Sequence, residues 1–466
     1  MKELGIIGLG VMGRNLALNM GDKGIEVSVY NKTTKKTEDF IEKEVGHRKI
    51  FGYGSLEEFV SSLERPRKIL LMIKAGEAVD SMIDQLLPYL DKGDLIMDGG
   101  NTHFKDTARR GEMLKGKGIH YIGLGVSGGE EGARNGPSLM PGGSPEAYSL
   151  VEDTLLKIAA KTDSGPCCTL VGGGSAGHFV KMVHNGIEYA MMQGIAESYD
   201  FMGKVLKLTS HEVGEGFENW NQGELNSYLI EITAKVLKYK DRDTGKPMVE
   251  LILDQAGQKG TGRWTVESAF ELGIPSPTLS AAVEARMISF YKEDRRSLSK
   301  GVDRFYPKLE YGKDVVISCL RDGLLFVFFN AFLQGAWIIQ QASKEYNYQV
   351  QLSEVFRIWK GGCIIRAKLL DFLREILREL EGDDLLLKSR KAMDYLNHIL
   401  DGAREVTQLA KDHYIPAFAH NSALDFFFSM TQEVLPANLI QAQRDFFGAH
   451  TFQRVDREGL FHINWK

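Results

Sequence analysis

The sequence predicts an α/β domain built on a parallel sheet, followed by a large all-α domain and a C-terminal tail. In the first 125 or so residues, short β-branched runs alternate with helix-length polar stretches, as they do in parallel βαβ units. A glycine cluster at residues 172–177 precedes long helical periodicities with few strand signals, and the final residues, 448–466, have no helical period. We therefore expect domains at residues 1–175 and 176–430 and a tail at residues 431–466.

The first domain contains candidate strands at residues 4–7, 26–30, 68–73, 94–98 and 120–123. Their alternation with helical stretches predicts a doubly wound sheet. In the second domain, Pro275 and Pro277 interrupt the helical pattern. The most apolar stretch there, residues 324–339, is broken by Asn330 and Gln334 and is too short to span a bilayer comfortably, so we expect a buried core helix.

Composition and charge narrow the classes of function. The chain of 466 residues is 43% hydrophobic and 26% charged, which is typical of a globular protein with more than one domain. The formal net charge of -5 argues against a nucleic-acid partner, because neutralising phosphates needs a basic excess. The cysteines form no CxxC pair, so we expect reduced thiols and no zinc motif. An apolar run begins at once at the amino terminus and leaves no room for a leader, so we expect a cytoplasmic protein.

A glycine-rich motif directly follows the first candidate strand and precedes a helix-like segment at residues 14–20. In a Rossmann-type dinucleotide-binding domain, the first glycine permits a tight turn, the second lets the backbone approach a pyrophosphate, and the third lets the helix pack on the strand. Such a motif alone is a weak signal, and a chance glycine turn has the same letters. Its place at the start of a βαβ pattern favours a cofactor site formed by Gly8, Leu9, Gly10, Val11, Met12 and Gly13.

The end of the second candidate strand indicates which dinucleotide binds. An acidic side chain at this place would bind the ribose 2′-hydroxyl of NAD and repel the 2′-phosphate of NADP. The chain has Asn31, Lys32 and Thr33 there, with no carboxylate, and all three side chains can contact a phosphate. NADP is therefore the expected cofactor. The alternative is a solvated loop in which Lys32, Lys35 and Lys36 only keep the protein soluble.

One helix-like segment, residues 177–192, is apolar except for a single stripe of polar side chains. The stripe consists of Lys181, His184, Asn185, Glu188 and Tyr189, which have the spacing of one helix face. Ionisable groups on an otherwise buried helix favour a cleft over solvent. Two structural interpretations compete with this one: Lys181 and Glu188 can form an ion pair, and His184 can be a hydrogen-bonded core histidine.

Several long motifs occur in a fixed order along the chain. They are GLGVMG at 8–13, DGGN at 98–101, VSGGEEGA at 126–133, MPGG at 140–143, HFVKMVHNGIEY at 178–189, QKGTGRWT at 258–265, AR at 285–286 and QRDFFGAH at 443–450. In these motifs the chain resembles the 6-phosphogluconate dehydrogenase family along essentially its whole length. So many matches in one order make coincidence negligible.

The resemblance implies an enzyme of the pentose phosphate pathway that converts 6-phosphogluconate to ribulose 5-phosphate and CO2 with reduction of NADP and without a metal ion. It implies Lys181 as the general base and Glu188 as the general acid. The substrate would be bound by Asn101, Ser127, Gly128, Gly129, His184, Asn185, Tyr189, Lys259, Arg286, Arg444 and His450. The cofactor would be lined by residues 8–13, Asn31, Lys32, Thr33, Ile73, Lys74, Ala75 and Asn101, the last lying between the two ligands.

The resemblance also implies a homodimer in which the tail, with Arg444 and His450, reaches the active site of the partner subunit. The alternative is a tail that folds back onto its own subunit. The family commonly has arginine where this chain has Lys32. An arginine can stack on adenine and bind the 2′-phosphate through its planar fork, which lysine cannot reproduce.

Two other functions are alternatives. A 3-hydroxyisobutyrate-type dehydrogenase is similar in its Rossmann start, its SGG loop and its lysine-bearing helix, but such enzymes are much shorter and have no reason to combine Glu188, Lys259, Arg286 and Arg444. A nucleotide-binding regulator that kept the fold and lost catalysis would be marked by the loss of Lys181 or Glu188, and both are present.

Overall fold

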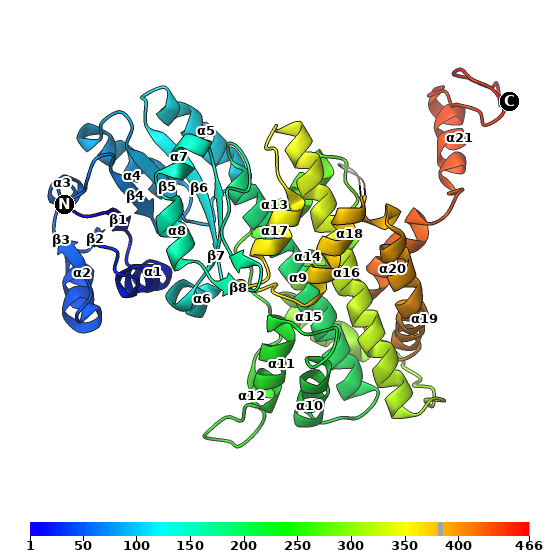
Figure 1. The fold of residues 1–466 in the computed structure, drawn as a ribbon. Helices are drawn as coiled ribbons and strands as arrows, with labels where there is room; N and C mark the ends of the chain where they lie inside the picture. The colour runs from blue at the N-terminus through cyan, green and yellow to red at the C-terminus, as the bar shows by residue number, and fades with distance from the viewer. Residues whose placement is uncertain (381–384, 466) are drawn as a thin grey trace.

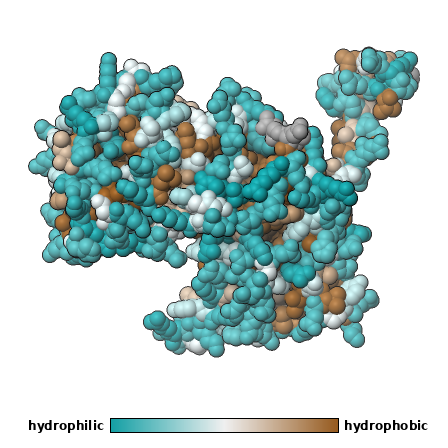
Figure 2. Space-filling model, in the orientation of Figure 1, coloured by the Kyte–Doolittle hydropathy of each residue, from teal (hydrophilic) through white to brown (hydrophobic). Residues whose placement is uncertain are grey.

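The computed structural model describes residues 1–380 and 385–465. Figure 1 shows a sheet-containing domain at the N-terminal end, a large helical domain beside it, and a C-terminal segment that stands clear of both. The surface is mostly hydrophilic, with apolar patches on the projecting segment and on the helical domain (Figure 2). The predicted order of an α/β Rossmann-type domain followed by a large all-α domain is confirmed.

The sheet has the strand order β3-β2-β1-β4-β5-β6-β7. Strands β1 to β6 are parallel, and β7 is antiparallel to β6. The strands are β1 (Leu4–Ile7), β2 (Val27–Tyr30), β3 (Ile50–Tyr53), β4 (Lys68–Leu71), β5 (Leu95–Asp98), β6 (His120–Ser127) and β7 (Ser138–Gly142), with a separate hairpin of β8 (Lys161–Thr162) and β9 (Gly165–Pro166). The sequence did not predict β3 or β7, because Gly52 and Pro141 are residues that strands usually exclude.

Helices cover both faces of this sheet. Within β5, Leu95 and Met97 point to one core and Ile96 to the other, as expected for a parallel strand buried on both faces. The first core is covered by α1 (Val11–Asp22), α2 (Thr34–Phe40), α6 (Gly129–Asn135), α7 (Pro145–Ser149) and α8 (Glu152–Ile158), and the second by α3 (Leu56–Ser61), α4 (Glu77–Leu86) and α5 (Phe104–Lys115). Strand order reverses between β1 and β4, so a crevice for a ligand is expected at their carboxyl ends.

The second domain begins with α9, which leaves the sheet domain at Ala176 and continues for 29 residues. The helices of this domain are α9 (Ala176–Lys204), α10 (Ser210–Trp220), α11 (Tyr228–Lys238), α12 (Met248–Leu251), α13 (Thr261–Glu271), α14 (Pro277–Ser289), α15 (Lys292–Leu298), α16 (Lys313–Glu345), α17 (Leu352–Ile358), α18 (Leu369–Glu379), α19 (Arg390–Asp412) and α20 (Phe418–Met430). Pro277 is the first residue of α14, where its missing N–H costs no helical hydrogen bond.

The apolar stretch at residues 324–339 lies inside a longer helix than the sequence predicted. With 33 residues, α16 is long and apolar enough to cross a bilayer, so the expectation that it is too short is wrong. The helix is mostly buried within the helical domain, packed against α9, α19 and α20, and it is a core helix as predicted.

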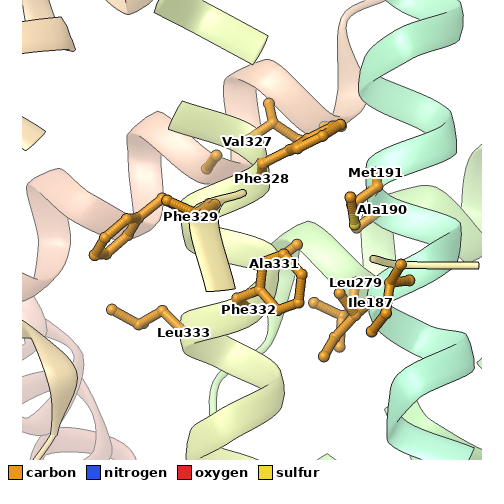
Figure 3. Packing of buried hydrophobic residues seen from close by; sticks show 14 of the residues in the cluster. Ile187, Ala190, Met191, Leu279, Val327, Phe328, Phe329, Ala331, Phe332 and Leu333 are labelled. Atoms are coloured by element: carbon orange, nitrogen blue, oxygen red, sulfur yellow. The ribbon is translucent and has the colours of Figure 1, made fainter. Parts of the chain in front are cut away.

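Helices α9 and α16 approach each other closely because glycines lie where they cross. A Cβ added to Gly335 of α16 would lie 2.5 Å from Cδ1 of Ile187 on α9, and one added to Gly194 of α9 would lie 2.9 Å from Val327. Figure 3 shows Ile187, Ala190 and Met191 packed among the apolar side chains of α16. One face of α9 therefore packs in the hydrophobic core, and its polar stripe lies on another face.

The C-terminal segment contains a helix that the sequence did not predict. Helix α21 (Ala437–Gly448) projects from the end of the helical domain farthest from the sheet (Figure 1). After it the chain turns back, and Phe452 and Phe461 pair through two backbone hydrogen bonds of 2.9 Å. We call residues 437–465 the tail.

Candidate active site

The glycine motif forms a tight turn between β1 and α1. Gly8 has φ +102°, and a Cβ there would lie 2.4 Å from the carbonyl oxygen of Met72. A Cβ on Gly13 would lie 2.0 Å from the carbonyl oxygen of Gly8, so only glycine lets α1 start this close to the strand. Gly10, by contrast, has nothing within 4 Å of an added Cβ. The open space at Gly10 and the first amides of α1 fit a dinucleotide pyrophosphate.

A hydrogen bond joins the end of β2 to this turn. The side-chain oxygen of Asn31 accepts a hydrogen bond of 3.1 Å from the backbone N–H of Leu9, and its amide nitrogen donates to the carbonyl oxygen of Thr33 at 3.3 Å. Lys32 and Thr33 are exposed beside it. Lys35 is paired with Asp39 at 3.4 Å, which makes it less suited than Lys32 to meet an anion.

Two further loops that were expected to line the cofactor follow β4 and β5, and one arginine connects them. Arg110 of α5 is fully buried and donates to Asp80 at 2.7 Å and to the carbonyl oxygen of Gly76 at 3.0 Å, just after residues 73–75. The same guanidinium lies 3.5 Å from the buried carboxylate of Asp98 at the end of β5. Asp98 in turn accepts hydrogen bonds from the loop that presents Asn101. Asn101 itself is exposed.

The polar stripe of α9 forms one cluster with the end of β6. The amino group of Lys181 donates to Asn185 at 2.7 Å and to the hydroxyl of Ser127 at 3.2 Å, and it lies 3.2 Å from Nδ1 of His184. The other ring nitrogen of His184 lies 3.1 Å from the Ser127 hydroxyl. Glu188 is one turn further along α9, with a carboxylate oxygen 3.9 Å from Nδ1 of His184. A direct Lys181–Glu188 ion pair, one of the structural alternatives, is not among the contacts of the described residues.

Burial changes the protonation of this cluster. Lys181 is only 7% exposed, and burial lowers the pKa of its amino group although the charge of Glu188 opposes the shift. Burial also lowers the pKa of His184 well below its ordinary value, with the charge of Lys181 adding to the effect. Burial raises the pKa of Glu188, against the influence of Lys181 and Arg286. The stripe therefore contains an amine that loses its proton more easily, and a carboxyl group that keeps its proton more readily, than the same groups do in water.

A second group of cations lies beyond Tyr189, at the far end of the stripe. The guanidinium of Arg286 lies over the ring of Tyr189, with 3.4 Å between its carbon and the ring centroid. Gly262 of α13 packs against the same ring, since an added Cβ would lie 2.5 Å from it. Lys259 is exposed just before α13. Arg286 thus places positive charge next to Glu188 and the Lys181 cluster, where a phosphate or a carboxylate of a substrate can bind.

The loop after β6 supplies backbone amides next to the cluster. Gly128 and Gly129 have φ of +110° and +60°, so both are in conformations that favour glycine, and α6 begins at Gly129.

Arg444 and His450 are the exception among the expected site residues. Both are exposed in the tail, which stands clear of α9 in the same chain (Figure 1).

Sequence reasoning missed two residues that organise the site. Thr261 is 6% exposed and accepts a hydrogen bond of 3.1 Å from the side-chain amide of Asn185, and its place inside the QKGTGRWT motif was the available signal. Arg110 had no signal, because its partners are far away in sequence. Across residues 1–380 and 385–465, no three His, Cys, Asp or Glu side chains are grouped as a metal site requires.

Comparisons with known proteins agree with this geometry. The families described as "NAD binding domain of 6-phosphogluconate dehydrogenase" and "6-phosphogluconate dehydrogenase, C-terminal domain" match residues 3–173 and 177–465. A relative from Bacillus subtilis, named "6-phosphogluconate dehydrogenase, NADP(+)-dependent, decarboxylating", is 50% identical over 100% of this chain and 99% of its own length. An Escherichia coli relative named "6-phosphogluconate dehydrogenase, decarboxylating" is 46% identical over the same shares.

A solved structure resembles the whole chain. It is the 6-phosphogluconate dehydrogenase of Plasmodium falciparum, described in its apo form, with its cofactor NADP+ and with its substrate 6-phosphogluconate. The two chains are 43% identical, and they superpose with a TM-score of 0.96 over 99% of this chain and 100% of the other. The chain belongs to the 6-phosphogluconate dehydrogenase family.

Proposed function

We propose that this chain is an NADP-dependent, decarboxylating 6-phosphogluconate dehydrogenase. The observation that supports this most is the buried Lys181 amino group, hydrogen-bonded to Ser127 and Asn185, with the half-buried Glu188 carboxyl group on the same face of α9. Family membership and the names of full-length relatives point to the same reaction. A 3-hydroxyisobutyrate-type enzyme would leave Glu188 and the cations beyond Tyr189 without a role.

The residues around the β1–α1 turn fit NADP. The pyrophosphate would occupy the open space at Gly10, against the amides of α1, and Asn31, Lys32 and Thr33 would face the 2′-phosphate. Residues 73–75 and Asn101 lie on loops fixed by Arg110 and would line the nicotinamide side. NADP bound there supplies the acceptor for the hydride that leaves C3 of the substrate.

Lys181 acts first as a general base. An ordinary lysine has a pKa of about 10.4 and is rarely neutral at pH 7, but burial lowers the pKa of Lys181. The neutral amine takes the proton of the C3 hydroxyl as hydride leaves the same carbon, which gives a 3-keto acid. Hydrogen bonds to Asn185 and Ser127 hold the amine in place for this transfer.

Lys181 then acts as an electrophile and Glu188 as the general acid. The ammonium formed in the first step polarises the new C3 carbonyl and donates its proton to the carbonyl oxygen as CO2 departs, so the released electrons give a neutral enediol. Glu188, whose pKa burial raises, protonates this enediol at C1 while the neutral amine of Lys181 takes the proton of the enol hydroxyl that becomes the ketone. The product is ribulose 5-phosphate. Because Lys181 provides the positive charge at C3, the proposal needs no metal ion.

The substrate's two anionic groups need several positive partners. We assign this role to Lys259 and Arg286 of the same chain and to Arg444 and His450 of a tail, together with Asn101, the backbone at Gly128 and Gly129, and the side chains of Ser127, His184, Asn185 and Tyr189. The functional units in this proposal are residues 1–175 for NADP, 176–430 for substrate and dimerisation, and 431–466 for the C-terminal segment that contains the tail.

We propose a homodimer in which each tail completes the active site of the partner subunit. Three observations support this arrangement: Arg444 and His450 are remote from α9 of their own chain, the tail projects from the body, and it exposes large apolar side chains (Figures 1 and 2). Those side chains include Leu439, Ile440, Phe446 and Phe447, and further exposed apolar residues, among them Phe290, Tyr291, Leu298 and Phe305, lie on and after α14 and α15. Apolar surface on this scale is typical of a subunit interface.

The test of the reaction is a product analysis with 6-phosphogluconate in deuterated water. The proposal expects one NADPH and one CO2 per substrate and one deuterium at C1 of ribulose 5-phosphate. Glu188→Gln is the informative variant, since a neutral amide cannot donate the C1 proton and should slow that step more than hydride transfer. Oxidation of 3-hydroxyisobutyrate in preference to 6-phosphogluconate would contradict the proposal.

A further inference from the structure

The tail is folded on itself around one carboxylate. Asp445, in the last turn of α21, is fully buried although the tail stands clear of the body. One of its oxygens accepts hydrogen bonds from the backbone N–H of Thr451 at 3.0 Å and from Nδ1 of His462 at 2.9 Å. The other accepts from the backbone N–H of Ile463 at 3.2 Å and from Nε1 of Trp465 at 2.8 Å. Both oxygens are thus saturated by donors of the tail itself.

These bonds attach two separate segments to the end of α21. Thr451 lies in the turn directly after the helix, whereas residues 462–465 return from the far side of the loop closed by Phe452 and Phe461. Although burial opposes ionisation, the hydrogen bonds from His462 and Trp465 and from the backbone lower the pKa of Asp445 to about 2. The group is therefore a carboxylate at neutral pH, and it can only accept hydrogen bonds.

The turn held by Asp445 has an unusual backbone. Ala449 and Thr451 have φ of +48° and +59°, a region that residues with a side chain rarely adopt, and they lie on either side of His450. The N–H of Ala449 donates to the carbonyl oxygen of Asp445 at 2.9 Å, and the N–H of Thr451 donates to its carboxylate. Gly448 leaves room for the His450 ring, since an added Cβ would lie 2.6 Å from Nε2 of that ring.

We infer that Asp445 is a positioning residue for substrate binding, whose carboxylate holds the turn that presents His450 at a fixed place relative to Arg444. The inference rests on the proposed function, in which Arg444 and His450 bind the substrate. Arg444 belongs to the last turn of α21, and its side chain donates to Gln441 at 2.9 Å on the helix surface. Without the carboxylate, the left-handed Thr451 loses the hydrogen bond made by its N–H, and the turn no longer holds His450 in a fixed position.

Asp445→Asn is the direct test. The variant keeps the size of the side chain but replaces an acceptor oxygen by an NH2 group that faces N–H donors. Hydrogen bonds to charged groups are among the stronger ones, so we expect KM for 6-phosphogluconate to rise by about tenfold or more, with a smaller change in kcat. Affinity for NADP should stay unchanged. Amide hydrogen exchange of Thr451 and Ile463 should become faster in the variant, which reports the loosened turn itself.

Asp456→Asn is the matched control, because Asp456 is an exposed tail carboxylate whose ion pair, among the described residues, is with its neighbour Arg454 at 2.7 Å, and it should behave as wild type. Trp465→Phe removes one donor to Asp445 and keeps an aromatic ring, so it should raise KM in the same direction by less. If Asp445→Asn fails to fold, the KM of Trp465→Phe tests the positioning role of Asp445 in its place.

Arg444→Ala and His450→Ala test the role of the tail in substrate binding separately from the positioning role of Asp445. If these variants raise KM while Asp445→Asn and Trp465→Phe match wild type, the positioning role of Asp445 is overturned. If Arg444→Ala and His450→Ala also match wild type, the proposed role of the tail in substrate binding fails as well.

Discussion

Gly125 of β6 lies directly against Lys181 of α9: a Cβ added to Gly125 would lie 2.6 Å from the Cβ of Lys181. The strand belongs to the sheet domain and the helix to the helical domain, so this contact sets the position of the proposed base relative to the cofactor crevice. Gly177, one turn earlier on α9, is equally close to the sheet, with an added Cβ 2.1 Å from the carbonyl oxygen of Gly123. The missing side chains let α9 lie on the sheet.

Gly125→Ala should therefore move Lys181 rather than unfold the protein. An overpacked core position costs about 1–3 kcal/mol, and a shift of the base of about 1 Å can lower the rate by about a hundredfold. We expect a large loss of kcat with a small loss of thermal stability. Gly203→Ala on the same α9 is the control, since nothing lies within 4 Å of its added Cβ. Full activity in Gly125→Ala would show that the contact does not position the base.

The pH profile should depend on the two shifted groups. Lys181 must be neutral, so activity should rise with pH through its pKa, which burial lowers below the ordinary value. Glu188 must be protonated, so activity should fall with pH through its pKa, which burial raises. We expect a bell-shaped profile, with an alkaline limb that is lost from the residual activity of Glu188→Gln. Activity that rises only near pH 10.4, as for an ordinary lysine, would contradict the lowered pKa of Lys181.

Asn31→Asp should shift the cofactor preference from NADP toward NAD. The aspartate keeps an oxygen for the N–H of Leu9, so the glycine turn stays intact, but its charge repels the 2′-phosphate. We expect KM for NADP to rise by at least about tenfold while KM for NAD stays similar or falls. Asn31→Ser, which loses the Leu9 contact without adding charge, is the control in the same assay. A wild-type enzyme that already prefers NAD would disprove the cofactor assignment.

The elements that position the site differ in how far the sequence predicts them. Local patterns were sufficient for β1, for the glycine turn and for the polar face of α9, because a strand, a turn and a helix face each depend on neighbouring residues. The antiparallel strand β7 was missed because it contains Pro141 and pairs through contacts distant in sequence. Arg110 was missed for a related reason, since its importance comes from Gly76, Asp80 and Asp98, which only the fold brings together.

The tail shows a different limit. The sequence after residue 448 has no helical or strand period. The folded turn there depends on Asp445, a buried charged residue that hydropathy alone would place in solvent. The motif that includes Arg444 and His450 predicted that these residues matter, but not that they stand apart from α9 of their own chain.

Mixed dimers test the sharing of active sites. Lys181→Ala and Arg444→Ala should each be nearly inactive as homodimers. If Arg444 acts on the partner's site, unfolding and refolding the two variants together creates heterodimers with one intact site, and random mixing should recover about a quarter of wild-type activity. If Arg444 acts within its own chain, every active site still contains one of the two substitutions, and no activity is recovered. Heterodimers that form, as shown by affinity tags, yet recover no activity would exclude the shared site.

The most direct test of the central claim compares wild type with Lys181→Met for binding and turnover of 6-phosphogluconate. Methionine fills a similar buried volume without an amine, so binding should remain within about tenfold while kcat falls by about a hundredfold to ten-thousandfold, because the lost interaction belongs to the transition state. Calorimetry gives the affinity for 6-phosphogluconate, and the rate at which NADPH and CO2 form together gives kcat. A Lys181→Met enzyme that binds the substrate and retains most of its kcat would remove Lys181 from the role of base.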